Sequence, residues 1–147
     1  MLTIVNKRVE IFEVGPRDGL QNEKTFIPTE KKLELIRLLQ EAGCSRIELT
    51  SFVHPKWVPQ LADALEVIRN VDLEDGREYN ALIPNLKGLE RALSTPLREV
   101  VTIMSASESH NTKNLNMSVA ESLEQMRIVN SIAREHGGRV RSYIGTA

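Results

Sequence analysis

The chain has a single cysteine, Cys44, so no disulfide can form within its 147 residues, and this cysteine usage is typical of a reducing compartment. Nowhere is there an unbroken apolar run long enough to span a bilayer. Residues 1–8 lack the apolar region and cleavage site of a signal peptide. The formal net charge of −1 points to neither a nucleic-acid nor a membrane partner. We therefore expect a soluble, cytoplasmic protein.

The composition is that of an ordinary globular domain, with 41% hydrophobic and 27% charged residues. The length predicts one domain covering residues 1–147. Apolar periodicity and turn residues predict alternating strands and helices. The expected strands cover 9–14, 45–52, 79–84, 99–106 and 140–145, and the expected helices cover 29–42, 61–68, 85–93 and 118–136, with a polar loop over 107–116.

Several residues mark the ends of these helices. Thr29 is expected to cap the first helix and Gly43 to end it. Ser118 and Glu121 have the spacing of a capping box at the start of the longest helix. The alternation of strands and helices predicts parallel βαβ units with right-handed crossovers.

No glycine-rich phosphate loop follows any of the expected strands, so a nucleotide-binding doubly wound sheet is unsupported. The alternative is a parallel (β/α)₈ TIM barrel, which takes about 250 residues. The chain would then form about the first half of such a barrel, with five strands and four helices.

Arg17 and Asp18 stand side by side after the first expected strand, where Gly15 and Pro16 end it. Parallel α/β folds place their chemistry at the C-terminal ends of strands. A carboxylate is a hard oxygen ligand for a divalent cation, and an arginine can stabilise a developing oxyanion. The simpler alternative, left open by the spacing alone, is a surface salt bridge beside a turn.

Four segments carry a resemblance to a known family, and the similarity extends from about Val9 to the last residue. They are GPRDGLQNE at 15–23, ELTSFVHPKWVPQ at 48–60, PNLKG at 84–88 and SASESHN at 105–111. Together they closely resemble the 3-hydroxy-3-methylglutaryl-CoA lyases. The RDGxQ core alone is shared with isopropylmalate synthases, homocitrate synthases and carboxyltransferases.

The resemblance implies a TIM-barrel enzyme that cleaves 3-hydroxy-3-methylglutaryl-CoA into acetoacetate and acetyl-CoA. Such enzymes act in leucine degradation and ketone body metabolism. The implied cofactor is a divalent cation, Mg²⁺ or Mn²⁺, which holds the substrate oxygens as a Lewis acid. The implied partner is a small acyl-CoA substrate.

Carried over by position, the resemblance makes Asp18 the metal ligand of the first strand. Arg17 would polarise the thioester carbonyl and stabilise the enolate, and Glu48 would be the active-site glutamate that orients this cluster. Gln21 and Ser51 would line the substrate pocket. Lys24 would contact a coenzyme A phosphate.

The family also uses a His-x-His pair, an asparagine and a cysteine on the later strands, which have no counterpart in this sequence. Cys44 is interpreted as a small buried hydrophobic residue at the opposite end of the barrel. His54 and His110 are interpreted as loop residues, and His136 as a residue at a helix C-terminus.

Two other functions stay open at this point. One is a Claisen-type acyl-CoA condensing enzyme with the same Arg-Asp pair. The other is a non-catalytic half-barrel, whose unpaired edge strands favour association. We expect either a homo-oligomer or pairing with a separate C-terminal half, and little or no lyase activity from the 147 residues alone.

Overall fold

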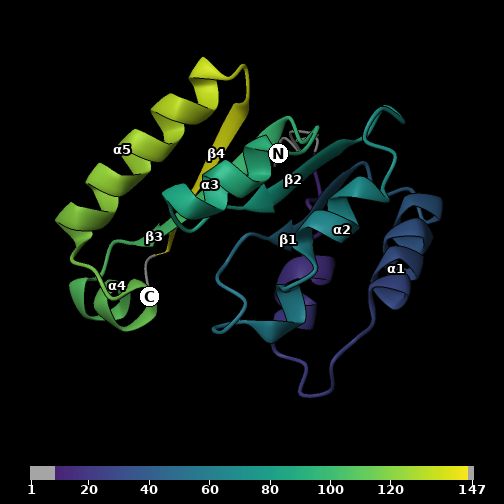
Figure 1. The fold of residues 1–147 in the computed structure, drawn as a ribbon, viewed down its shortest axis with the longest axis horizontal. Helices are drawn as coiled ribbons and strands as arrows, with labels where there is room; N and C mark the ends of the chain where they lie inside the picture. The colour runs from purple at the N-terminus through teal and green to yellow at the C-terminus, as the bar shows by residue number, and fades with distance from the viewer. Residues whose placement is uncertain (1–8, 146–147) are drawn as a thin grey trace, which may run out of the picture.

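A computed structural model describes residues 9–145, which form a four-stranded parallel sheet flanked by helices (Figure 1). The strands lie in the order β1-β2-β3-β4, so each pairs with its neighbour in sequence. Their bounds are β1 Arg46–Ser51, β2 Glu78–Leu82, β3 Glu99–Ser105 and β4 Arg139–Gly145. A parallel sheet with this simple order is the arrangement of successive strands in a (β/α)₈ barrel.

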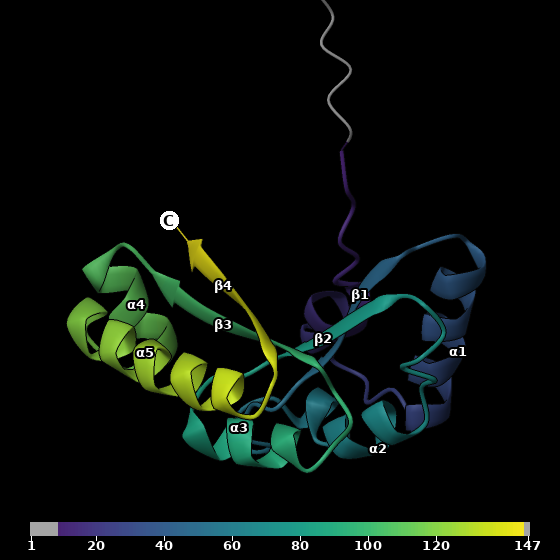
Figure 2. The same ribbon diagram turned by 90° about the horizontal axis from the view of Figure 1, so that it is seen from above.

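Four helices cover one face of the sheet, which curves away from them (Figure 2). They are α1 Thr29–Glu41, α2 Ala64–Arg69, α3 Leu86–Leu93 and α5 Val119–Glu135. A fifth helix, α4 Glu108–Leu115, lies at the C-terminal end of β3 (Figure 1). The predicted partial TIM barrel is thereby confirmed. No helix within residues 9–145 is both long and apolar enough to cross a membrane.

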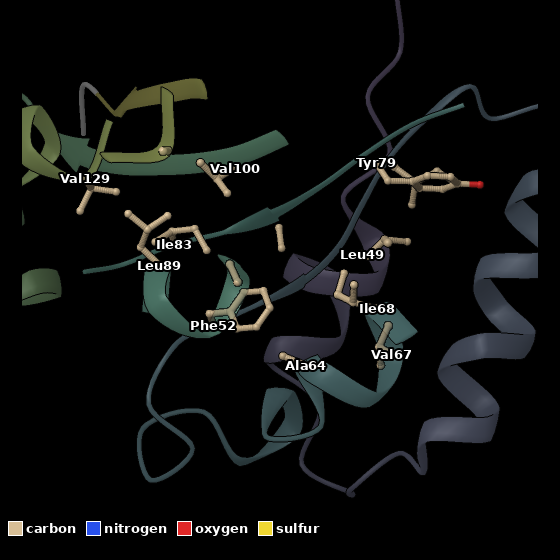
Figure 3. Close-up of a cluster of buried hydrophobic side chains, with 14 of the residues drawn as sticks. Leu49, Phe52, Ala64, Val67, Ile68, Tyr79, Ile83, Leu89, Val100 and Val129 are labelled. Carbon is tan, nitrogen blue, oxygen red and sulfur yellow. The ribbon is translucent and has the colours of Figure 1, made fainter. Parts of the chain in front are cut away.

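The hydrophobic core lies between the sheet and its helices (Figure 3). Alternate residues of each strand point into this layer because side chains alternate across a strand. Phe52, which follows β1 and is 2% exposed, packs where β1 meets α3. The buried cluster includes Ile47, Leu49, Phe52, Tyr79, Ala81, Ile83 and Val100 from the strands and their ends, with Ile36, Ala64, Ile68, Leu89 and Val129 from the helices.

The predicted strand over 9–14 is wrong. A single parallel bridge joins Glu13 to Ile47, in which Glu13 donates to Arg46 O at 2.9 Å and Glu48 N donates to Glu13 O at 2.8 Å. Val9 and Ile11, which gave the segment its alternating pattern, are 81% and 75% exposed. The alternating pattern therefore does not mark a buried strand face, because Val9 and Ile11 are not covered by any other part of residues 9–145.

The predicted loop over 107–116 is also wrong, because α4 occupies most of it. Ser107 caps this helix by accepting from His110 N, and Asn116 ends it in the left-handed conformation at φ 55°. The polar composition hid a helix whose stability comes from its caps and from the buried side chain of Asn111. The described residues thus contain four strands and five α-helices, where five and four were expected.

The predicted helix ends were mostly confirmed. Gly43 follows α1 with φ 90°, and Ser118 and Glu121 form the capping box of α5. Thr29 is not the cap of α1, because Pro28 holds that position. The Thr29 hydroxyl instead donates to Asp63 Oδ2 at 2.8 Å, which joins α1 to the residue before α2.

Replacing Phe52 with alanine should destabilise the chain by about 3–5 kcal/mol, because it opens a cavity between β1 and α3. Chemical denaturation monitored by circular dichroism measures this. Trp57→Ala is the matched control: Trp57 is 70% exposed, so its loss should change the free energy of unfolding by no more than about 0.5 kcal/mol. Equal effects of the two substitutions would contradict the core described above.

Candidate active site

A short π-helix, η1 Gly15–Gly19, carries Arg17 and Asp18 (the purple turns near β1 in Figure 1). The Glu13 bridge ends just before it, and the Glu13 carboxylate accepts from Gly15 N at 2.6 Å. Pro16, which lacks an amide proton, is tolerated in the first turn. The bridge to β1 therefore fixes where the helix begins, and η1 contacts β1 closely.

Glu48 is fully buried in β1, and both of its carboxylate oxygens are occupied. Arg17 Nε donates to Oε1, and the Tyr143 hydroxyl donates to Oε2 at 3.2 Å. The Arg17 side chain is itself only 9% exposed. A buried carboxylate requires a partner charge, and these contacts supply one cation and one neutral donor.

Asp18 lies on the outer side of the same guanidinium. Its Oδ1 is 2.5 Å from Arg17 Nη1, and its side chain is 56% exposed. Arg17 thus joins a buried carboxylate to an accessible one. The surface salt bridge considered from the sequence describes the Asp18 side of this arrangement but not the buried pair with Glu48.

Tyr143 is a site residue that the sequence reasoning missed. It lies on β4, yet its hydroxyl reaches Glu48 on β1, at the far side of the four-stranded sheet. The contact is possible because the sheet is strongly curved (Figure 2). Burial, the charge of Glu48 and the hydrogen bond to it raise the pKa of Tyr143 to about 12, so the phenol is neutral at ordinary pH.

Three further predicted site residues form no hydrogen bond or ion pair with this cluster in the part of the chain that the structure describes. Gln21 follows η1 and is half-buried, and Lys24 is exposed in the next loop. Ser51 is buried at the end of β1, where its hydroxyl donates to Leu82 O and accepts from Val53 N, both at 3.2 Å. The serine therefore shapes the chain that leaves β1.

Gln60 holds the loop that contains Lys24, and no local sequence pattern predicts this role. Its Nε2 donates to Glu23 O at 3.0 Å and to Thr25 O at 2.5 Å, and its Oε1 accepts from Ile27 N at 3.1 Å. These bonds use both donors and the carbonyl oxygen of a buried side-chain amide. The loop after η1 is thereby attached to the segment before α2.

The described residues offer an incomplete site for a divalent cation. Within residues 9–145, no three His, Cys, Asp or Glu side chains gather as a metal site would require. Asp18 supplies one accessible hard ligand, whereas Mg²⁺ favours six. Cys44 lies between α1 and β1, at the end of the strand that η1 does not occupy, and is half-buried rather than buried as the sequence predicted.

The histidines also have local roles. His54 Nδ1 accepts from Lys56 N at 3.2 Å, and a His110 ring nitrogen lies 3.0 Å from Asn114 Nδ2. His136 caps α5, with Nδ1 2.8 Å from Ile132 O. These positions agree with the interpretation of His54 as a loop residue and of His136 as a helix-end residue. The interpretation of His110 as a loop residue is wrong, because His110 lies within α4.

Comparison with known proteins shows a consistent similarity across the chain. The family described as HMGL-like matches residues 8–145. Hydroxymethylglutaryl-CoA lyase YngG of Bacillus subtilis is 51% identical over 140 residues, which cover 95% of this chain and 47% of that protein. The human mitochondrial hydroxymethylglutaryl-CoA lyase is 48% identical over 141 residues, covering 96% of this chain and 43% of that protein.

Solved structures give the same result. The crystal structure of the B. subtilis HMG-CoA lyase superposes with a TM-score of 0.89 at 51% identity, over 94% of this chain and 46% of that one. An HMG-CoA lyase from Acinetobacter baumannii, in complex with coenzyme A and 3-methylmalate, superposes with a TM-score of 0.86 at 38% identity, over 92% and 44%. The chain spans about half the length of the relatives it matches.

The raised pKa of Tyr143 predicts a loss of stability at high pH. The unfolded chain releases this proton near the ordinary value of 10.0, whereas the folded chain keeps it until about pH 12. The stabilisation is therefore fully present below pH 10 and is lost as pH rises toward 12. The free energy of unfolding should fall more steeply over this range in the parent than in Tyr143→Phe, as measured by urea denaturation at several pH values. Identical slopes would contradict the contact with Glu48.

Proposed function

Because the chain belongs to the HMGL-like family, we propose that it supplies the N-terminal part of the active site of a TIM-barrel lyase. The proposed reaction cleaves 3-hydroxy-3-methylglutaryl-CoA into acetoacetate and acetyl-CoA. The observation that carries this proposal is the guanidinium of Arg17, held between buried Glu48 and accessible Asp18 at the end of the sheet. The similarity to lyases over 95% of the chain supports it.

The reaction needs stabilisation of negative charge. A base removes the proton of the tertiary hydroxyl group, whose carbon becomes the ketone carbon of acetoacetate as the adjacent carbon–carbon bond breaks. The electron pair of that bond passes to the thioester as an enolate, which is then protonated to acetyl-CoA. A positioned cation beside the thioester oxygen therefore lowers the barrier.

Arg17 is suited to that position. Its Nε and Nη1 are taken by Glu48 and Asp18, whereas Nη2 has no hydrogen bond to any residue in the described part of the chain. Two fixed contacts orient the planar guanidinium before substrate arrives, so little reorganisation is needed. Glu48 acts in this scheme by orienting Arg17, and neutral Tyr143 fixes the second oxygen of Glu48.

We assign Asp18 as one ligand of the divalent cation, Mg²⁺ or Mn²⁺. When bound, the cation would polarise the substrate oxygens. Its remaining ligands would come from outside the residues described. Gln21 and Ser51 are proposed to line the substrate pocket, and Lys24, exposed on the loop held by Gln60, to meet a coenzyme A phosphate.

The proposed partner of this chain is the second half of the barrel, or another copy of the chain. β4 is the last strand of the sheet, so one of its edges has no partner within residues 9–145. Ile144 on this strand is 61% exposed. An unpaired edge with exposed apolar residues favours association.

The proposed setting is cytoplasmic leucine degradation or ketone body metabolism.

A chimaera tests the proposed activity. The part of this chain that aligns with B. subtilis YngG over 140 residues would replace its counterpart in that protein. The expected result is metal-dependent release of acetoacetate from 3-hydroxy-3-methylglutaryl-CoA. Arg17→Lys keeps the charge but removes the planar group that contacts both Glu48 and Asp18. This substitution should lower kcat by about 10²–10³-fold. A coupled assay of acetoacetate measures this.

The matched control is Arg98→Lys, which alters an arginine that is 74% exposed and should leave kcat unchanged. A chimaera that folds, as shown by a cooperative thermal transition, but does not cleave the substrate would overturn the proposal. Turnover of acetyl-CoA with a 2-oxo acid would instead favour the condensing enzyme.

Light scattering of the 147-residue chain tests association, and a well-behaved monomer would count against the non-catalytic half-barrel.

A further inference from the structure

A row of polar side chains crosses the concave face of the sheet. Glu48, Asn80, Glu99 and Arg139 are register partners on β1, β2, β3 and β4. Glu99 is only 6% exposed, and its Oε1 accepts from Asn80 Nδ2 at 3.1 Å. Asn80 therefore separates two buried carboxylates, and the second of these, Glu99, takes no part in the site described so far.

Arg141 supplies the cation for this second carboxylate. Its Nε donates to Glu99 Oε1 at 3.3 Å. Arg139 also approaches Glu99, with Nε 3.4 Å from Oε2, but the Arg139 side chain is 59% exposed while that of Arg141 is 33% exposed. Because water screens the more exposed pair, Arg141 is the better partner for the buried charge.

The guanidinium of Arg141 also stacks on the ring of Phe12, 4.4 Å from its centroid. Phe12 directly precedes Glu13, which pairs with β1 and leads into the π-helix that carries Arg17. On its own strand, Arg141 lies two residues before Tyr143, so both side chains face the same side of the sheet. Arg141 thus contacts or adjoins both segments that deliver a partner to Glu48.

We propose that the Arg141–Glu99 pair is a positioning device, which holds Arg17 and Tyr143 within hydrogen-bonding distance of Glu48 without touching substrate. The expected effect of the pair on catalysis rests on the proposed function. Its effect on the contacts of Glu48 does not. The need for such a device follows from the Tyr143–Glu48 distance of 3.2 Å, at the upper end of hydrogen-bond lengths. A small shift of β4 would break that bond.

Two substitutions test the proposal. Arg141→Lys keeps the charge but removes the planar group that stacks on Phe12. Glu99→Gln with Arg141→Met removes both charges together, so neither is left buried alone. The exposed pair Glu74–Arg98, 2.8 Å apart, provides the matched control as Glu74→Gln with Arg98→Met.

The readout is the ionisation of Tyr143. The chain has two tyrosines, so Tyr79→Phe leaves Tyr143 as the single reporter. Incorporating 3-fluorotyrosine lowers the intrinsic pKa and keeps the titration within a pH range that preserves the fold. In the parent, the midpoint should lie well above that of free 3-fluorotyrosine, because burial and Glu48 raise the pKa of Tyr143.

In both Arg141 variants the midpoint should move toward the free value, because the phenol leaves Glu48. The charge of Arg141 lowers the pKa of Tyr143, so a simple loss of that charge without movement would raise the midpoint instead. An unchanged or raised midpoint in variants that keep a cooperative thermal transition would overturn the proposal. The Glu74–Arg98 control should keep the parent midpoint.

The catalytic consequence is measured in the chimaera. Both Arg141 variants should lower kcat by at least tenfold with little change in KM, and the Glu74–Arg98 control should change neither. Because the titration uses no substrate, a shifted midpoint in a protein without lyase activity would refute the proposed function alone. A shifted midpoint with unchanged kcat would refute the catalytic role of the pair.

Discussion

The buried charge of Glu48 is the constraint on which the rest of the structure depends. A carboxylate with no exposed surface is costly unless its charge and its hydrogen-bonding capacity are both met. Here the cation comes from a π-helix near the start of the chain, and the second donor comes from the last strand. The sheet must therefore curve enough to bring β4 across to β1. The half-barrel shape and the satisfied carboxylate require each other.

The same arrangement separates two acids that share one arginine. Glu48 is fully buried, and its contact with Arg17 Nε fixes one side of the guanidinium. Asp18, on the solvent side, has the accessibility that a metal ligand needs. An arginine fixed between them is oriented in advance, and oriented cations contribute more to transition-state stabilisation than mobile ones. The geometry thus buries one of these carboxylates and leaves the other accessible, a difference that the sequence does not reveal.

Much of this could be predicted from the sequence. The four paired strands were expected because β3 is a short apolar run and the other three alternate polar and apolar residues, and the capping box of α5 follows a spacing rule. Arg17, Asp18 and Glu48 were expected through the family resemblance, and the structure brings them together.

What could not be predicted depends on tertiary contacts. The run over 9–14 has strand periodicity, but its pairing with β1 is limited to one bridge. The helix α4 depends on Asn111, whose side chain bonds to Ser105 N, Met117 O and Ser122 Oγ, none of which a local pattern reveals. Tyr143 is 95 residues from Glu48, and only the curvature of the sheet joins them. The alternation of Arg139, Arg141 and Tyr143 on β4 was the available signal.

The central claim is that Arg17 and Glu48 act as one buried unit, and a double-mutant cycle on the free energy of unfolding tests it most directly. Arg17→Met should destabilise the chain by about 3–5 kcal/mol, because it leaves a buried carboxylate unpaired. Adding Glu48→Gln should then restore much of that loss, giving a coupling energy above about 1 kcal/mol. If the effects of the two substitutions instead add independently, Glu48 does not depend on Arg17 and the two residues do not act as one unit.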